Sequence, residues 1–185
     1  LIYPGLITGI THSLFPWEAK GSFMSHKGIR VGSYWIGQSF TAPHYFWGRP
    51  SSTPSVPYNA LYSLGANLGP SSPIRLQNML SRITTLQTTN NGINTLIPFN
   101  LVAASGSGLD PDISASAAQY QILRVAKARQ LPIETVVRLV ENTIVGRTAH
   151  VLGEARVNVL QLNLTLDRLY PMPVADIRIN NGKTS

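Results

Sequence analysis

A stretch of 26 residues without a helical or strand pattern, residues 48–73, most strongly constrains what this chain can fold into. It is rich in Pro, Ser, Gly and Asn, which favour turns over regular structure. Loops of this length are uncommon inside compact domains, and those that occur are either functional or disordered. Tyr58, Tyr62 and Leu64 are spaced along the stretch. These side chains favour an ordered loop that is held against the domain.

The composition predicts one globular domain. The chain has 185 residues, of which 43% are hydrophobic and 12% are charged. This length is typical of a single domain and can bury a substantial core, and the apolar content argues against a disordered chain. The chain has no Cys. That absence excludes disulfide bonds, thiolate zinc sites and a cysteine nucleophile.

The first 15 residues are mostly apolar and have two interpretations. A helix that spans a bilayer needs about 20 apolar residues, so this run is too short to be a complete one. It is either the last part of a membrane anchor, over residues 1–16, or an apolar first helix that packs on the domain. Pro16 then breaks the segment, and Trp17 suits a membrane–water boundary.

The remaining patterns predict a single compact soluble α+β domain over residues 17–170, behind a truncated N-terminal transmembrane helix. Residues 171–185 read as a loosely ordered tail. Residues 29–36 and 96–104 favour strands, and residues 105–112 a turn-rich loop. Helices are expected from Ser72 to residues 90–92, from Ser114 onward, and from Pro132 to Gly146. In residues 160–166 Leu alternates with polar residues, as in a strand, but Leu favours a helix, which we expect there.

Catalytic and metal-binding motifs are missing from the sequence. There is no Walker A loop, no H-E-x-x-H and no G-x-S-x-G. The four histidines lack ligand spacing, so we expect structural or surface roles for His12, His26, His44 and His150. Asp110 and Asp112 either hold a small cation or form the turn before a helix, and the turn is favoured. Catalysis is therefore the less favoured class of function, and we expect no metal site.

The net charge of +7 raises the question of a nucleic-acid partner. The basic residues are scattered, and the densest group is Arg124, Lys127 and Arg129, near the end of a predicted helix. Cations in the last turn interact favourably with the helix dipole. We interpret the group as a solvated helix face, and we expect no nucleic-acid partner.

A series of motifs in the same order resembles the C subunit of the bacterial Kdp potassium-transporting ATPase. The resemblance covers almost all of residues 1–170. The motifs are GSYWIGQSF at residues 32–40, FWGRPS at 46–51, YN at 58–59, GANLGP at 65–70, LVAASGSGLDP at 101–111, QYQ at 119–121, RVAKAR at 124–129 and GEARVNVLQLNL at 153–164.

The resemblance implies a non-catalytic, single-pass subunit of the bacterial inner membrane. Its implied partners are the channel-like A subunit, the ATP-hydrolysing B subunit and the small F subunit. The family is described as a catalytic chaperone that raises the ATP affinity of the B subunit, with ATP shared rather than stably bound. The implied nucleotide-binding residues are Gln38, Gly37 and Ser33. Alternatively, Gln38 satisfies backbone groups at the end of a strand. One neutral amide contributes about 0.5–1.5 kcal/mol, which tunes a shared site but does not build one.

Family descriptions place the domain on the outer, periplasmic face, over the entrance of the channel-like subunit. There the candidate partner-interface residues are Arg49, Tyr58, Asn59 and Asn67. A basic surface at a potassium entrance would repel the ion, so the positive residues should point away from it. The alternative function is a purely structural outer domain that braces the channel-like subunit and makes no nucleotide contact.

Overall fold

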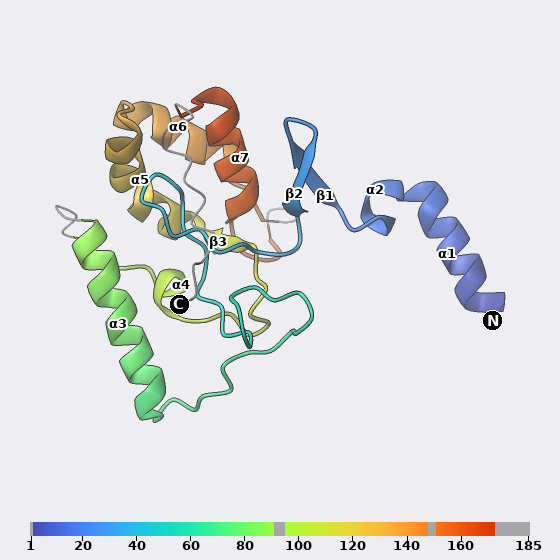
Figure 1. The fold of residues 1–185 in the computed structure, drawn as a ribbon, viewed down its shortest axis with the longest axis horizontal. Coiled ribbons are helices and arrows are strands. Elements are labelled where there is room, and N and C mark those ends of the chain that lie inside the picture. The colour runs from blue at the N-terminus through green and yellow to red at the C-terminus, as the bar shows by residue number, and fades with distance from the viewer. Residues whose placement is uncertain (1, 91–94, 148–150, 173–185) are drawn as a thin grey trace, which may run out of the picture.

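The computed structural model describes residues 2–90, 95–147 and 151–172. The expected loose tail after Pro171 and the position of His150 therefore lie almost entirely outside the described residues. The elements form an α+β fold, as predicted (Figure 1). They are α1 (Ile2–Leu14), α2 (Pro16–Ala19), β1 (Phe23–His26), β2 (Ile29–Ser33), α3 (Pro73–Thr89), α4 (Phe99–Val102), β3 (Asp112–Ser114), α5 (Ala115–Arg129), α6 (Ile133–Thr143), β4 (Arg156–Asn158) and α7 (Val159–Leu169).

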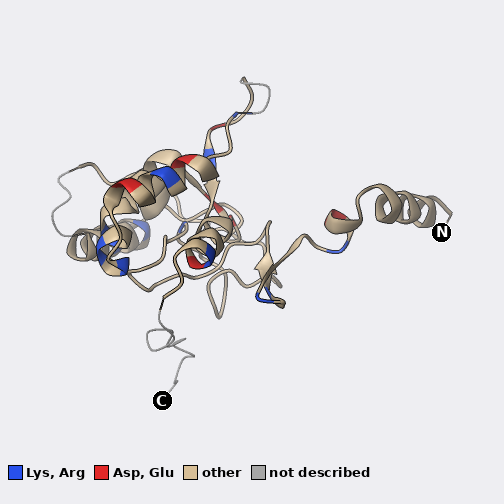
Figure 2. Ribbon diagram, turned by 90° about the horizontal axis from the view of Figure 1, so that it is seen from above, with Lys and Arg blue, Asp and Glu red and all other residues tan. Residues whose placement is uncertain are grey.

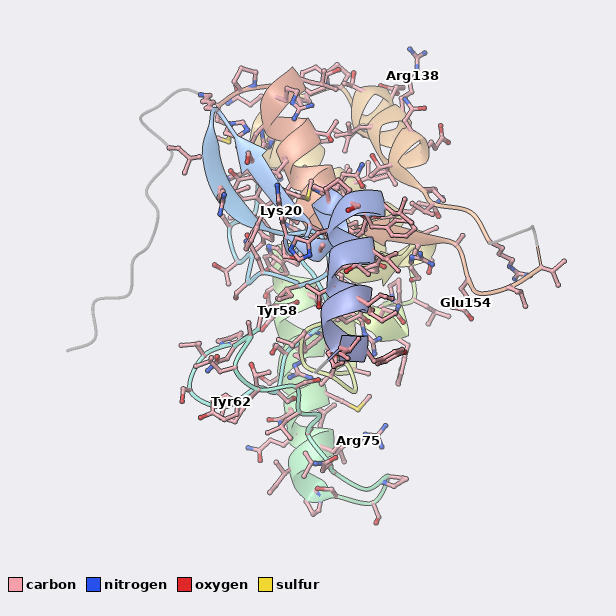
Figure 3. All side chains as sticks on the ribbon, turned by 90° about the vertical axis from the view of Figure 1, so that its right-hand side faces the viewer. Lys20, Tyr58, Tyr62, Arg75, Arg138 and Glu154 are labelled. Carbon is pink, nitrogen blue, oxygen red and sulfur yellow. The ribbon has the colours of Figure 1, made fainter. Side chains whose placement is uncertain are left out.

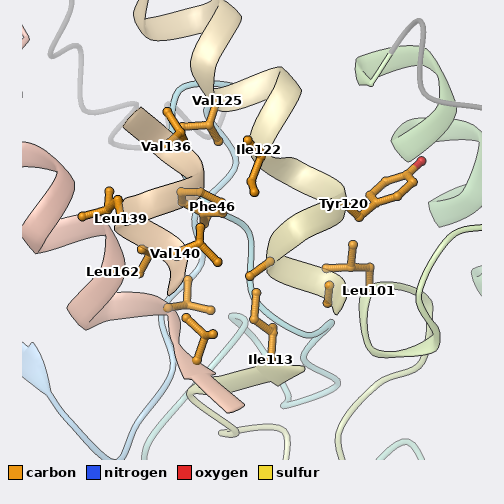
Figure 4. Packing of buried hydrophobic residues seen from close by; sticks show 14 of the residues in the cluster. Phe46, Leu101, Ile113, Tyr120, Ile122, Val125, Val136, Leu139, Val140 and Leu162 are labelled. Atoms are coloured by element: carbon orange, nitrogen blue, oxygen red, sulfur yellow. The ribbon is translucent and has the colours of Figure 1, made fainter. Parts of the chain in front are cut away.

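Two small antiparallel sheets accompany the helices. Strands β1 and β2 form a hairpin, and strands β3 and β4 pair with Ile113 opposite Val157. Helices α5, α6 and α7 pack over the second sheet, and the core lies between them (Figure 4). Its fully buried side chains include Phe46, Ile113, Val125, Val136, Val140, Val157, Leu162 and Leu166. Phe46 comes from the loop after β2, so a loop residue completes a helical core.

The helix starts predicted at Ser72 and Ser114 are confirmed, and side-chain caps specify both; α6 begins at Ile133, directly after Pro132, without a side-chain cap. The Ser72 hydroxyl accepts a hydrogen bond from the Arg75 backbone N–H, and the Ser114 hydroxyl accepts one from Ala117. Asn158 caps α7 in the same way. Each cap satisfies one of the unpaired N–H groups of a first helical turn. The alternating Leu run at residues 160–166 lies in α7 and is helical, as expected.

Three other predictions from the sequence differ from the structure, either in the type of element or in the residue at which it ends. Residues 96–104 do not form a strand: Pro98, which cannot donate a backbone hydrogen bond, precedes the short helix α4. The strand predicted over residues 29–36 ends at Ser33. Helix α6 ends at Thr143, before Gly146, because Val145 is already extended and exchanges two backbone hydrogen bonds with Arg156.

Helix α1 extends away from the domain (Figure 1) and buries none of its residues. The interpretation as a first helix packed on the domain is therefore wrong. The side chain of Ile2 is 87% exposed, and Leu6, Ile10 and Leu14 are exposed as well. Within the part of the chain that the structure describes, no helix combines the length and apolarity needed to cross a bilayer. The membrane anchor over residues 1–16 stays a prediction.

Two buried amide side chains hold the loop after β2 against the core. Gln121 of α5 accepts from the Trp47 N–H at 2.8 Å and donates to the Trp47 carbonyl at 3.1 Å. Asn163 of α7 does the same for Phe46, at 2.9 Å in both directions. These side chains replace the backbone partners that a neighbouring strand would supply. The loop therefore passes between two helices without belonging to a sheet.

The basic group on α5 does not form a solvated face. Arg124 and Arg129 are only 5% and 9% exposed, whereas Lys127 is exposed. The Arg124 guanidinium donates to the carbonyls of Pro43 and Tyr45 at 2.5 and 2.9 Å and to Asn90 at 3.2 Å. It also stacks 4.1 Å from the centre of the Trp47 ring. Burial lowers the pKa of Arg124 to about 10, which leaves it charged at neutral pH.

Arg129 makes the second buried attachment. Its guanidinium pairs with the Asp167 carboxylate at 2.6 Å and donates to the carbonyls of His44 and Tyr170 at 2.8 and 3.0 Å. Two of the three cations in the densest basic group are therefore occupied inside the protein. They are not available to nucleic-acid phosphates.

We predict that Arg124→Met lowers the free energy of unfolding by at least about 3 kcal/mol. The substitution removes the guanidinium that donates several hydrogen bonds and leaves buried backbone carbonyls without a donor. Lys127→Met on the same helix is the matched control and should change it by less than about 0.5 kcal/mol, since its side chain is exposed. Urea unfolding followed by circular dichroism measures both variants. Equal effects of the two substitutions would contradict the assigned role of Arg124.

Candidate functional site

Tyr58 is the centre of the candidate site, because the structure packs two of the recognised motifs against its ring. A Cβ atom on Gly37 would overlap Tyr58 Cε1, and one on Gly48 would lie 2.6 Å from the Tyr58 hydroxyl oxygen. The Tyr58 hydroxyl donates to the Arg49 carbonyl, and its backbone N–H donates to the Ser51 hydroxyl. Only glycine leaves room for the ring at these two positions.

Arg49 ties this loop to the loop before β3. Its Nη1 pairs with Asp110 Oδ2 at 2.8 Å, and its Nη2 donates to the Ala104 carbonyl at 3.4 Å. The other Asp110 oxygen accepts from the Asp112 N–H at 3.0 Å, which is the expected turn. Asp112 pairs with Arg156 at 3.0 Å. Each carboxylate therefore has an arginine partner, which supports the turn interpretation over a cation site.

Burial raises the pKa of Tyr58 to about 12, with a smaller contribution from the negative charge of Asp110 and an opposing one from Arg49. The phenol therefore stays protonated at physiological pH. A protonated hydroxyl is needed here, because it donates to the Arg49 carbonyl. The raised pKa of Tyr58 therefore reflects mainly the burial of its phenol.

The three candidate nucleotide-binding residues do not form one pocket. Gln38 folds back over Gly32, where an added Cβ would overlap Gln38 Nε2, and this nitrogen donates to the Val31 carbonyl at 2.5 Å. The Ser33 hydroxyl donates to the Gly21 carbonyl at 2.8 Å, on the β1 side of the hairpin. Gly37 donates its N–H to the Leu109 carbonyl at 2.9 Å. The Gln38 amide thus satisfies a backbone carbonyl, as the alternative interpretation proposed.

Two hollows lie where the long loop meets α3. The first, of about 360 Å³, is bordered by Arg49 and Tyr58 together with Phe40, Trp47, Arg82 and Leu101. The second, of about 290 Å³, is bordered by Asn67, Arg75, Asn78, Arg82 and residues 103–106. The predicted interface residues Arg49 and Tyr58 therefore share one hollow and Asn67 lines the other.

Asn59 shapes the loop instead of lining either hollow. Its side-chain oxygen accepts from the Leu61 N–H at 3.1 Å, and its own N–H donates to Thr53 Oγ1 at 3.1 Å. Sequence reasoning missed Arg75 and Arg82 as site residues. A signal existed, because residues seven apart in the predicted helix lie on one face, two turns apart.

The described residues form an α+β domain whose recognised polar side chains mostly hold loops in place. The family described as "K+-transporting ATPase, c chain" (KdpC) matches residues 1–168. The chain belongs to this family, as the motif series indicated, and is a subunit of a potassium-transporting ATPase.

The sequences of individual relatives support the same family. The KdpC subunit of the potassium-transporting ATPase of Paraburkholderia phytofirmans is 50% identical over 169 residues, which cover 91% of this chain and 88% of the relative. The KdpC subunit of Herpetosiphon aurantiacus has the same identity and coverage. That of a Janthinobacterium species is 48% identical over 168 residues, or 91% and 89% of the two chains.

We predict that Gly37→Ala lowers the free energy of unfolding by about 1–3 kcal/mol, because the added methyl overlaps the Tyr58 ring and lies 2.7 Å from the Asp110 carbonyl oxygen. Gly69→Ala, in the long loop of residues 48–73, has no atom within 4 Å of its added Cβ and is the control. It should change stability by less than about 0.5 kcal/mol. Urea unfolding measures both. A Gly37 variant as stable as the control would contradict this packing.

Proposed function

We propose that this chain is a non-catalytic accessory subunit that docks on the potassium pump and stabilises its assembly. Its partners are the channel-like A subunit, the ATP-hydrolysing B subunit and the F subunit. The observation that supports this role best is how the long loop is held. Arg49 pairs with Asp110, the Tyr58 hydroxyl donates to the Arg49 carbonyl, and the second Asp110 oxygen accepts from the Asp112 N–H. The loop is therefore a preformed surface, which lowers the entropic cost of binding a partner.

The exposed apolar side chains of α1 support anchoring in the bacterial inner membrane through residues 1–16. They have no place to pack in the domain, and Trp17 is about half exposed at the end of the segment. Amphipathic rings such as Trp are enriched at membrane interfaces. We place the domain, residues 17–170, on the outer face, where it braces the channel-like subunit.

The side of the membrane is testable because the chain has no Cys. We predict that Glu134→Cys, an exposed position on α6, is labelled by a membrane-impermeant thiol reagent in intact cells that express the whole pump with the full-length chain. The Cys-free parent gives the background, and opened cells give the total labelling. Labelling only after the cells are opened would place the domain inside and overturn the proposed location.

A second candidate function is the catalytic chaperone, which raises the ATP affinity of the B subunit. One observation favours it: among the described residues, no hydrogen bond is donated to Gln38 Oε1. This oxygen can accept from a ribose hydroxyl of an ATP molecule held mainly by the partner. Gly37 and Ser33 would lie near the nucleotide without binding it, because the Gly37 N–H and the Ser33 hydroxyl already donate to backbone carbonyls. ATP would be shared between the subunits.

The chaperone role predicts that Gln38→Ala lowers the apparent ATP affinity of the purified pump by up to about tenfold, the limit for one neutral hydrogen bond. Gly32→Ala should act in the same direction, since it displaces the Gln38 amide without removing it. Gln161→Ala, at another half-buried glutamine, is the control. The measurement is ATP hydrolysis at varied ATP concentration. An unchanged affinity with intact assembly would exclude the chaperone role and leave docking as the function.

A further inference from the structure

One part of the molecule is nearly free of charge. The described residues between 50 and 109 comprise the long loop, α3, α4 and the loop that precedes β3, and we call them the neutral lobe. In residues 50–109 the only charged side chains are Arg75 and Arg82, although the whole chain has 15 basic and 8 acidic residues. Figure 2 shows the Lys, Arg, Asp and Glu residues mainly on other segments. The lobe is therefore poor in charged side chains of both signs, and the two that it has are both positive.

The neutral lobe also exposes many large apolar side chains. Leu96 is 95% and Leu61 86% exposed, and the others are Val56, Tyr62, Leu64, Ile74, Leu76, Leu80 and Phe99. Protein surfaces that face only water usually carry charges of both signs among their apolar atoms. Depletion of charge together with exposed apolar and aromatic side chains is instead typical of the centre of a protein–protein interface. The lobe has this composition on a loop and a helix that lie side by side.

The two charges of the lobe border the same hollow. Arg75 and Arg82 both line the cavity of about 290 Å³, together with the amide side chains of Asn67 and Asn78. Arg82 donates one hydrogen bond, to the Val102 carbonyl at 2.9 Å. Within the described residues neither arginine forms an ion pair. Burial lowers the pKa of Arg82, which shows that its charge is partly desolvated without a compensating anion.

We propose that the neutral lobe is the face that docks on a protein subunit of the pump, and that its hollow receives a carboxylate side chain of that partner between Arg75 and Arg82. This inference rests on the proposed docking function and names the surface that performs it. Guanidinium groups bind carboxylates through paired, charge-assisted hydrogen bonds. The two asparagine amides can donate to the same group. The apolar side chains around the hollow would exclude water from the contact.

Other occupants fit the lobe less well. An anionic membrane surface attracts clusters of Lys and Arg, and the lobe has none beyond the two arginines in the hollow. Its loop also exposes backbone and hydroxyl groups, for which lipid tails offer no hydrogen bonds. A second copy of the chain in a symmetric pair would place the same surface on both sides. That arrangement sets arginine against arginine and supplies no carboxylate.

The test is co-purification of the full-length chain with its partner subunits from membranes. We expect Arg75→Gln combined with Arg82→Gln to weaken retention about 30-fold, the loss typical of an interface hot spot. Arg138→Gln removes one positive charge from the exposed face of α6, as Arg75→Gln does from the hollow, and should have no effect. Figure 3 shows Arg138 and Arg75 at opposite ends of the molecule. Arg75→Glu should weaken retention more than Arg75→Gln, because it opposes a carboxylate with a carboxylate.

The single substitution Arg75→Gln distinguishes loss of docking from loss of folding, because the Arg75 guanidinium has no hydrogen-bond partner among the described residues. It should leave urea unfolding unchanged and still weaken retention. If the unaltered chain itself fails to co-purify, the proposed function fails. If the unaltered chain and the double variant are retained equally, the docking function stands and this inference is overturned.

A thiol probe introduced by Gln77→Cys, at an exposed position on α3, identifies the occupant. We expect the assembled pump to protect this thiol from labelling, whereas the thiol of Glu134→Cys on α6 stays reactive. Protection by lipid vesicles alone, without the partner subunits, would assign the lobe to the membrane and overturn the proposal. Cross-linking of the Gln77→Cys thiol to a second copy of the isolated chain would overturn it as well.

Discussion

The buried guanidinium of Arg124 holds together segments that are far apart in the sequence. It reaches from α5 to the carbonyls of Pro43 and Tyr45 and to Asn90 at the end of α3, and it lies on the ring of Trp47. These contacts fix where the loop after β2 crosses the core and where α3 ends. Because Phe46 enters the core from that loop, the attachment determines core packing as well as loop position.

The long loop depends on this attachment. Residues 48–73 have no strand partner, so side chains must satisfy backbone groups that a sheet would otherwise satisfy. Ser51, Thr53 and Asn59 do this within the loop, and Arg49 connects it to Asp110. The ring of Tyr58 is then enclosed against Gly37 and Gly48. The result is a surface of irregular structure held by many side-chain hydrogen bonds, next to helix α3, which carries Arg75 and Arg82.

A loop surface held in this way suits a subunit that acts by binding to a partner subunit. The chain belongs to the KdpC family of a potassium-transporting ATPase, and the polar groups of its recognised motifs mainly hold loops. Arg75 and Arg82 are the two charged side chains of the neutral lobe, and the remaining 13 basic and all 8 acidic residues lie elsewhere in the chain.

Local signals in the amino-acid sequence were enough to specify the main helices and the family. Ser72 and Ser114 set helix starts through contacts three residues away, and the ordered motifs identify the family without reference to the fold. The roles of Arg124 and Arg129 became visible only in the folded chain. Their position near a helix end indicated a solvated face, but the carbonyl partners at Tyr45 and His44 lie about 80 residues earlier in the chain, and the one at Tyr170 lies 41 residues later. The same limit applies to residues 96–104, where the pattern predicted a strand but the fold provides no strand to pair with. It also applies to Gln38, because its backbone partner depends on how the chain folds over Gly32. Caps and periodicity act within one turn of helix, whereas burial and pairing of a long polar side chain depend on which distant segment folds against it.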